Sequence, residues 1–132
     1  MLPVMEFAFP GPLRDQLVAA VLSGAKTTTT GLFLPDEPLE KAGERYAVVD
    51  SDGRRVAVIE MTDVRVVRLA DVDLRHAVDE GEGDEWVAQW RANHEKFWHS
   101  PEVRAEMGAD FQVHDDTLVG VKRFRLVTDK PR

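Results

Sequence analysis

The feature that most constrains the fold is a turn signal between two runs of strand-forming residues. Asp52-Gly53 follows the run YAVVD and precedes the run RRVAVIEMTDVRVVRL, which extends from residue 54 to residue 69. An Asp-Gly pair in this setting strongly favours a tight β-hairpin, because glycine tolerates the positive backbone φ that the turn requires. The sequence therefore predicts two adjacent antiparallel strands.

The second run is too long and too evenly apolar to be a flat strand with a single buried face. Its apolar residues occupy both alternating sets of positions, and polar residues interrupt it near the middle. One set is Val56, Val58, Val64 and Val66, the other is Ala57, Ile59, Met61 and Leu69, and the interruption is Glu60, Thr62 and Asp63. This pattern predicts a bend or β-bulge in a curled sheet.

Helices are expected on both sides of this hairpin. The segment PLRDQLVAAVLS has apolar residues at helical spacing, begins at Pro12 and is followed by Gly24, which suits a helix end. A short helix is expected over residues 71–80, a longer one from Asp84, and another after Ser100, which is a good helix cap. A final strand is expected in TLVGVKRFRLV. This order predicts one α+β domain over residues 1–132, with about five to six strands in a β-barrel closed by the first and last strands.

The composition restricts the possible partners and the cellular setting. The chain contains no cysteine, which excludes a disulfide framework, a thiolate zinc site and a cysteine nucleophile and fits a reducing cytoplasm. The N-terminal segment MLPVMEFAFPGP lacks the pattern of a signal peptide, and no apolar run approaches the roughly 18 residues of a membrane span. We therefore expect a cytoplasmic protein that does not enter membranes.

The chain is acidic, with 17 basic and 24 acidic residues and a formal net charge of −7. Such a field repels polyanions, so indiscriminate binding of DNA or RNA through phosphate attraction is not expected. A nucleic-acid role would require a local basic pocket or a small nucleoside-like ligand.

The segment GAKTTTTG places one lysine before four consecutive threonines. These β-branched residues favour a strand, in which Thr28 and Thr30 would share the side of Lys26 while Thr27 and Thr29 face the opposite side. In a structural interpretation, Lys26 compensates the dipole at the end of the preceding helix. In a chemical interpretation, a desolvated lysine acts as a base toward a nearby hydroxyl nucleophile.

The acidic segment DEGEGDE, residues 79–85, follows the second predicted helix. A charge run usually forms a solvated loop, but Gly81 and Gly83 would permit the backbone to turn a carboxylate inward. His76 and Glu80 lie four residues apart on one helical face, as in an acid–base pair or part of a metal site. Two groups do not define a metal site, so no ligand is assigned and a divalent metal stays an open alternative.

Aromatic residues recur at helical spacing in the next segment, at Trp86, Trp90, His94 and Trp98. Such a stripe is more typical of a buried helix face than of a platform for stacking nucleic-acid bases. We therefore expect Trp90 and Trp98 in the core, with His94 as a hydrogen-bonded histidine among them.

The densest basic cluster lies near the C-terminus and consists of Lys122, Arg123 and Arg125. Alternation along a strand puts the two arginines on one face of the sheet. That face could supply the local positive patch that an acidic RNA-binding protein requires.

Several of these segments together resemble the ASCH domain, a PUA-like β-barrel family associated with RNA-related functions. In chain order they are LVAAVLSGAKTTTTGL, AGERYAVVDSDGRRVAVIEMTDVRVV, HAVDEGEGDEW, WRANH and KRFRLV. The resemblance extends from about residue 10 to residue 127 and implies a small PUA-like β-barrel flanked by helices. The EGEGD and W-x-x-x-H features resemble those of larger bacterial members.

The resemblance also implies a site. Lys26, Thr29 and Glu80 match the lysine, threonine and glutamate of the active site proposed for ASCH-like enzymes. Because strand alternation puts Thr29 opposite Lys26, the match requires a twist or bulge where the helix meets the strand. Substrate contacts are expected from Thr27, Arg123 and Arg125.

Members of the family differ in activity, and the resemblance leaves three roles open. Some small members are amidohydrolases that deacetylate a modified cytidine, larger ones are closer to a metal-assisted single-strand ribonuclease, and others are RNA-binding modules. We expect a pocket that accepts RNA or a nucleoside. A hydrolase is the preferred interpretation, and a non-catalytic binding module is the alternative.

Overall fold

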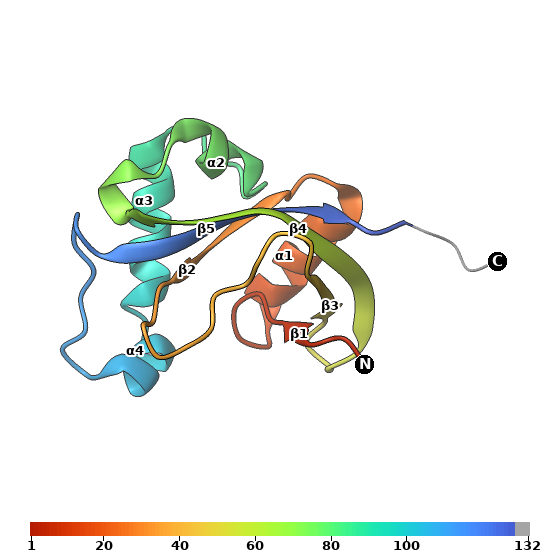
Figure 1. Cartoon of the computed structure of the whole chain (residues 1–132). Coiled ribbons are helices and arrows are strands. Elements are labelled where there is room, and N and C mark those ends of the chain that lie inside the picture. The colour runs from red at the N-terminus through yellow and green to blue at the C-terminus, as the bar shows by residue number, and fades with distance from the viewer. Residues whose placement is uncertain (129–132) are drawn as a thin grey trace.

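The computed structural model describes residues 1–128, which form a five-stranded mixed sheet with helices packed against it (Figure 1). This arrangement confirms the predicted α+β class. In chain order the elements are β1 (Val4–Met5), α1 (Pro12–Ser23), β2 (Thr28–Leu32), β3 (Arg45–Val49), β4 (Arg55–Arg68), the 3-10 helix η1 (Leu69–Asp71), α2 (Leu74–Asp79), α3 (Val87–Trp98), α4 (Pro101–Met107) and β5 (Leu118–Leu126).

Strands β3 and β4 form the antiparallel hairpin predicted at Asp52-Gly53. Gly53 has a φ of 79°, as the turn requires. The Asp50 carboxylate accepts hydrogen bonds from the backbone N–H groups of Asp52 and Arg54, each at 2.9 Å. The turn is therefore held by residues that are close together in the sequence.

Strand β4 changes partners along its length. Its first half pairs with β3 and its second half pairs with β5, and the register with β5 shifts between Met61 and Asp63. The predicted bulge at the polar interruption is thus confirmed. Ile59 and Met61 belong to one buried cluster, whereas Val67 packs against a second cluster. Val64, from the other alternating set, packs against the first cluster beyond the bulge, so residues of both sets in β4 reach the core.

The strand order is β1-β3-β4-β5-β2, and only β1 and β3 run parallel. The predicted closure by the first and last strands is not observed, because β1 pairs with β3 while β5 lies between β4 and β2. Within residues 1–128 the sheet is therefore open, with β1 and β2 as its edges. A cavity of about 690 Å³ lies between these edges, and β1, with two residues, is too short to bridge it.

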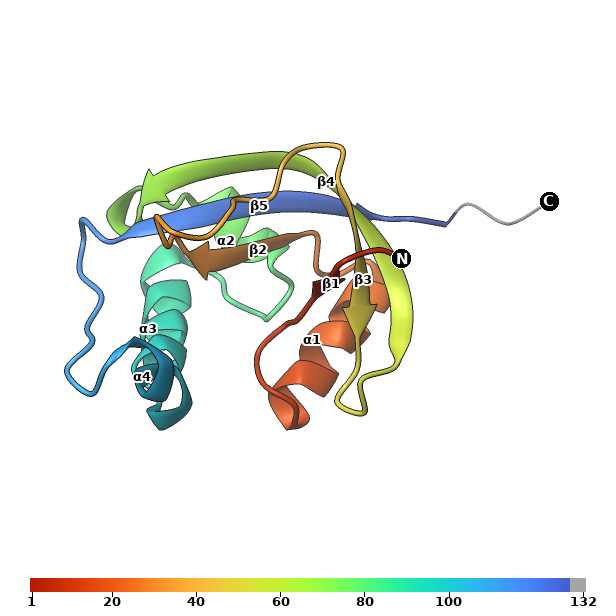
Figure 2. The same ribbon diagram turned by 60° about the horizontal axis from the view of Figure 1, so that its bottom comes forward.

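The core has two parts, one beneath each end of the curled sheet. Figure 2 shows α1 near β1 and β3, and α3 with α4 at the opposite end. Trp90 and Trp98 are 0% and 4% exposed in the second part, which confirms that these two residues are core, whereas Trp86 at the start of the stripe is 55% exposed. The first part comprises Phe7, Leu17, Val18, Val21, Val48, Ile59, Met61 and Phe124. The second comprises Leu69, Val72, Ala77, Trp90, Trp98, Val113, Val119 and Val121.

The ends of α1 and α4 follow the sequence signals, whereas α2 and α3 each begin three residues later than expected, α2 at Leu74 after the Asp73 cap. Helix α1 begins at Pro12 and is followed by Gly24 with a left-handed φ of 86°, and the Ser100 hydroxyl caps α4. Helix α3 begins at Val87 instead of Asp84, because the Asp84 carboxylate accepts a hydrogen bond from the Asn93 side chain at 2.8 Å instead of capping the helix. Across residues 1–128, no helix is both long and apolar enough to cross a membrane.

Candidate functional site

Lys26 and Glu80 form a buried ion pair at the junction between α1 and β2. Lys26 is 2% exposed and Glu80 is 1% exposed. The Lys26 Nζ lies 3.5 Å from the Glu80 Oε1 and 3.4 Å from the Glu80 backbone oxygen. The Glu82 Oε2 lies 4.0 Å from the same nitrogen. The structure thus brings together a lysine and a glutamate that the sequence separates by 54 residues.

A close backbone approach sets the position of this pair. Gly81 has a φ of 73°, and a Cβ at that position would lie 2.5 Å from the backbone oxygen of Ala25. The loop after α2 therefore lies directly on the segment that contains Lys26. Glu80 and Glu82, on either side of Gly81, are turned toward the lysine. The expectation that glycine turns a carboxylate inward is confirmed at this position.

Glu80 is surrounded by hydrogen-bond donors. Its Oε2 accepts from the Thr30 hydroxyl at 2.7 Å and from the indole N–H of Trp90 at 2.9 Å. Its Oε1 lies 3.1 Å from the Nε2 of His94 and is the oxygen that faces Lys26. Both carboxylate oxygens are therefore occupied by donors from β2 and α3.

Burial and neighbouring charges act in opposite directions on the two glutamates. Burial alone would raise the pKa of Glu80, but hydrogen bonds with His76 and His94 and the charge of Lys26 hold that pKa well below its usual range. At Glu82, burial and the adjacent Glu80 outweigh Lys26 and raise the pKa to about 7. Two carboxyl groups in one site thus differ in protonation near neutral pH.

His94 is held by a hydrogen bond at each ring nitrogen. Its Nδ1 lies 2.9 Å from the backbone oxygen of Trp90 and its Nε2 3.1 Å from Glu80. Both partners are acceptors, so the doubly protonated ring satisfies both contacts. Burial opposes this charge, but the hydrogen bond with Glu80 and its charge raise the pKa of His94 above its usual value. His94 is therefore a hydrogen-bonded histidine, as predicted, and it also lines the cavity described below.

The threonine segment uses most of its hydroxyls to attach β2 to α2. The Thr28 hydroxyl donates to the backbone oxygen of His76 at 2.9 Å, and the Thr27 hydroxyl lies 3.5 Å from the backbone oxygen of Asp79. Thr30 donates to Glu80 and lies 2.7 Å from the Nε2 of His76. Within β2, the hydroxyls of the face that Thr28 and Thr30 share therefore have structural partners.

Thr29 differs from the other threonines of β2. Within the described chain its hydroxyl makes no hydrogen bond to protein, and the residue lines the cavity beside Lys26. Thr30, which strand alternation places on the side of Lys26, is the threonine that contacts Glu80. Thr30 is thus the threonine that is hydrogen-bonded to the ion pair, and Thr29 is the one that offers an unbonded hydroxyl to the cavity.

A cavity of about 680 Å³ adjoins the ion pair, and the polar wall beside the pair comes from three separate segments. Phe9, Phe97 and Trp98 contribute apolar surface to the same cavity. The cavity between the sheet edges lies next to it, because Phe7, Thr29 and Thr30 line both. The polar wall beside the ion pair contains Lys26, Thr29, Thr30, Glu80, Glu82, Asn93 and His94.

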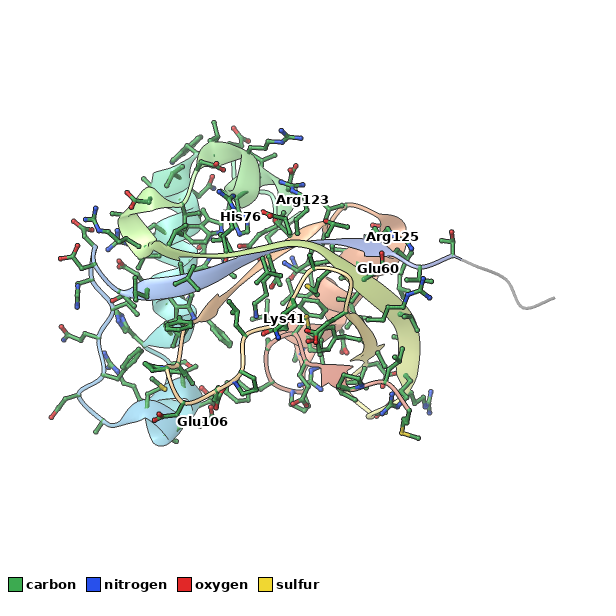
Figure 3. The ribbon with its side chains drawn as sticks, viewed as in Figure 1. Lys41, Glu60, His76, Glu106, Arg123 and Arg125 are labelled. Carbon is green, nitrogen blue, oxygen red and sulfur yellow. The ribbon has the colours of Figure 1, made fainter. Side chains whose placement is uncertain are left out.

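The two arginines expected to bind substrate do not line this cavity. Arg123 donates to the Asp79 carboxylate at 2.9 Å, and Arg125 donates to Glu60 at 3.2 Å. In Figure 3, Arg125 and Glu60 lie next to each other over β4 and β5. Thr27 does not line the cavity either, since it lies against Asp79. The structure therefore separates these three residues from the group around Lys26.

Three potential metal ligands also meet in this site. Ligand atoms of Glu80, Glu82 and His94 lie within 4.8 Å of one another. The Lys26 Nζ, however, lies 3.5 Å from Glu80 and 4.0 Å from Glu82, so an ammonium group already supplies the positive charge that these carboxylates require. The His94 Nε2 is directed at Glu80. The donor set fits a lysine counter-ion better than a divalent metal.

The pKa shifts predict how stability depends on pH. Folding raises the pKa of Glu82 from 4.5 to about 7, so its contribution is fully present below pH 4.5 and is lost as the pH rises through about 7. The raised pKa of His94 extends this loss above pH 6.5. We expect the free energy of unfolding, measured with urea, to decrease between pH 5 and pH 8.

Replacement of Glu82 by glutamine should reduce this decrease by at most about 3 kcal/mol, because the neutral amide does not titrate. Glu85→Gln, at an exposed position in the same segment, is the matched control and should leave the pH dependence unchanged. An unaltered slope between pH 5 and pH 7 in Glu82→Gln would contradict the shifted pKa.

Comparison with known proteins supports a family assignment. The family model of the ASCH domain matches residues 5–128. The crystal structure of an ASCH domain from Lactobacillus crispatus JV V101 is similar with a TM-score of 0.81 and 23% identity, over 94% of this chain and 78% of that one. Protein EF3133 from Enterococcus faecalis V583 gives a TM-score of 0.82 and 26% identity, over 96% of this chain and 77% of that one. A comparison with curated proteins gave no match. Because the family model covers nearly the whole chain, this protein belongs to the ASCH domain family.

Proposed function

We propose that this protein is a hydrolase that acts on a modified nucleoside or an exposed nucleotide of single-stranded RNA. The observation that carries this proposal is the group of Lys26, Glu80, Glu82 and His94 at the wall of a 680 Å³ cavity, in which Lys26 and Glu80 are buried and Glu82 and His94 are partly exposed. Cavities of this size accommodate small-molecule ligands. Perturbed ionisable groups concentrated in such a cavity are typical of catalytic sites.

Each residue of the site has a role that its contacts support. The Lys26 ammonium is placed to stabilise negative charge that develops on a carbonyl or phosphoryl oxygen. Glu80 holds Lys26 in place through the 3.5 Å contact between their charged atoms. Thr29 offers a cavity-lining hydroxyl, which serves as nucleophile or orients an attacking water.

The charge of the cavity favours a nucleoside over a phosphate-rich ligand. Lys26 and His94 share the cavity lining with a larger number of glutamates, and Figure 3 shows one of these, Glu106, on α4. This excess of negative charge repels phosphate. The glutamates that line the cavity are Glu6, Glu37, Glu80, Glu82 and Glu106.

A non-catalytic binding module is the second candidate, and one observation favours it. The Glu80 carboxylate is fully hydrogen-bonded, with donors at both oxygens, so the group also serves to join β2, α2 and α3. In this role the same cavity holds a nucleobase without chemical change. The RNA-related associations of ASCH domains support an RNA ligand for such a module.

A screen of the purified protein against modified nucleosides and short single-stranded RNA distinguishes these functions. We expect hydrolysis of an acylated nucleoside, detected by chromatography, without a requirement for added manganese or magnesium. Turnover of RNA that depends on added metal would favour a ribonuclease. Binding of short RNA that weakens with salt, without turnover of any substrate, would replace the hydrolase by the binding module.

The two central threonines of β2 provide a matched pair for the nucleophile. Thr29→Val and Thr30→Val each delete one hydroxyl while keeping the branched shape that favours a strand. We expect loss of activity in Thr29→Val if its hydroxyl is the nucleophile, with stability unchanged. Thr30→Val removes a hydrogen bond to Glu80 and should lower stability by about 1–2 kcal/mol. Full activity in Thr29→Val would assign the attack to water.

A further inference from the structure

The two glutamates beside Lys26 differ in their access to the cavity. The Glu80 side chain is 2% exposed, whereas the Glu82 side chain is 23% exposed. Both residues line the cavity, but Glu80 is enclosed by Thr30, Trp90 and His94. A molecule in the cavity can therefore reach the carboxyl group of Glu82 more readily than that of Glu80.

Proton transfer requires a carboxyl oxygen that can form a new hydrogen bond with the substrate or with water. Each oxygen of Glu80 already accepts from donors on β2 and α3. The Oε2 of Glu82 faces the Lys26 Nζ at 4.0 Å, a distance too long for a direct hydrogen bond. Glu82 shares a side-chain hydrogen bond with Glu80, and its partly exposed carboxyl group keeps acceptor capacity on the side that is open to the cavity.

We propose that Glu82 transfers protons in the reaction of this site, and that Glu80 is a positioning residue which holds Lys26 and His94. This assignment rests on the proposed hydrolase function. It differs from the family resemblance, which directs attention to Glu80 through residue type alone. It uses a carboxyl group that is accessible and adjacent to the positive charge.

Hydrolysis of an amide substrate then takes place in two stages, attack by water and departure of the amine. The Glu82 carboxylate accepts one proton from a water molecule as the water oxygen forms a bond to the carbonyl carbon, and the carbonyl electron pair moves onto oxygen. The Lys26 ammonium stabilises that oxyanion. When the tetrahedral intermediate collapses, the C–N bond breaks and Glu82 returns the proton to the leaving nitrogen. The carboxylate is thereby regenerated.

The charged groups around Glu82 suit this exchange near neutral pH. Glu80 from the loop after α2, Lys26 from the segment before β2, and His94 from α3 all face it. Burial and Glu80 raise the pKa of Glu82, Lys26 and His94 lower it, and the result is about 7. A general base is most effective when its pKa lies near the operating pH.

The test compares pH profiles of kcat/KM, for an acylated nucleoside that the wild-type protein hydrolyses, in the variants Glu82→Gln and Glu85→Gln. We expect Glu82→Gln to lower kcat/KM by about 100-fold and to remove the rise in rate near pH 7. Glu85→Gln, at an exposed position in the same segment, should behave as wild type. Glu82→Asp should restore the rise in rate, since it returns a carboxyl group.

Two outcomes would overturn the assignment, and they are distinguishable. A wild-type rate and pH profile in Glu82→Gln would leave the hydrolase function intact and remove Glu82 from proton transfer. Absence of turnover by the wild-type protein on every acylated nucleoside and RNA would remove the proposed function and this role together. Circular dichroism of each variant separates loss of activity from loss of folding.

Discussion

Replacing Lys26 with methionine is expected to lower turnover by about two to four powers of ten and the free energy of unfolding by about 3–5 kcal/mol. The variant keeps an unbranched side chain but removes the ammonium group that lies 3.5 Å from Glu80 and 4.0 Å from Glu82. A buried carboxylate would then lose its nearest positive charge. Steady-state kinetics and urea unfolding measure the two effects.

Ligand binding should respond much less than turnover if Lys26 acts on the transition state. An interaction made mainly in the transition state changes kcat, whereas one made equally with bound substrate changes affinity. Calorimetric titration with a non-hydrolysed analogue measures the affinity. If the wild-type protein shows no turnover and Lys26→Met binds the ligand much more weakly than wild type, Lys26 is instead a ligand anchor of a binding module.

Two further variants test the stability part of this prediction. Arg125→Met removes a cation that pairs with Glu60 at the surface, where the side chain is 46% exposed, and should cost no more than about 1 kcal/mol. Adding Glu80→Gln to Lys26→Met should regain part of the loss, because it removes the uncompensated charge. If Lys26→Met lowers the free energy of unfolding by no more than Arg125→Met does, the buried pair does not stabilise the fold as proposed.

Replacing Gly81 with alanine should lower the free energy of unfolding by about 3 kcal/mol or more and should abolish turnover. The residue has a φ of 73°, and the new Cβ would lie 2.5 Å from the backbone oxygen of Ala25. Neither backbone segment can yield without displacing Lys26 from Glu80 and Glu82. The loss of stability and the loss of activity therefore have one physical cause.

Gly83→Ala is the matched control for this prediction. Gly83 also has a positive φ, of 88°, but a Cβ added there would have no heavy atom within 4 Å. It should therefore cost only the backbone strain, about 1–2 kcal/mol. The difference between the two variants isolates the close approach to Ala25. Equal losses in both would show that strain alone accounts for the effect at Gly81.

Much of the fold could be predicted from the sequence because its signals are local. The Asp52-Gly53 turn and the cap at Ser100 each depend on residues within a few positions of one another. The bulge in β4 was also predictable, since it follows from polar residues in an apolar run. The end of α1 at Gly24 was predictable for the same reason, because it depends on a single glycine directly after the helix.

The incorrect predictions concern interactions between distant segments. Closure of a barrel depends on whether β1 and β2 meet, and a cavity lies between them. The start of α3 was displaced because Asp84 pairs with Asn93. The substrate contact expected of Arg123 stays a prediction, and the partner that the structure gives it, Asp79, lies 44 residues away in the sequence. Alternation predicts which face a side chain occupies and does not identify the group that it meets.

The sequence by itself determined the residue types available for chemistry and the glycine that permits a turn between Glu80 and Glu82. Only the tertiary structure decided which carboxyl group is enclosed, which is accessible, and that Thr30 contacts Glu80 while Thr29 lines the cavity. The physical reason is that solvent access and pKa depend on packing between β2, α2 and α3. These elements meet in space although the chain separates them, so no local pattern encodes the environment of Glu82.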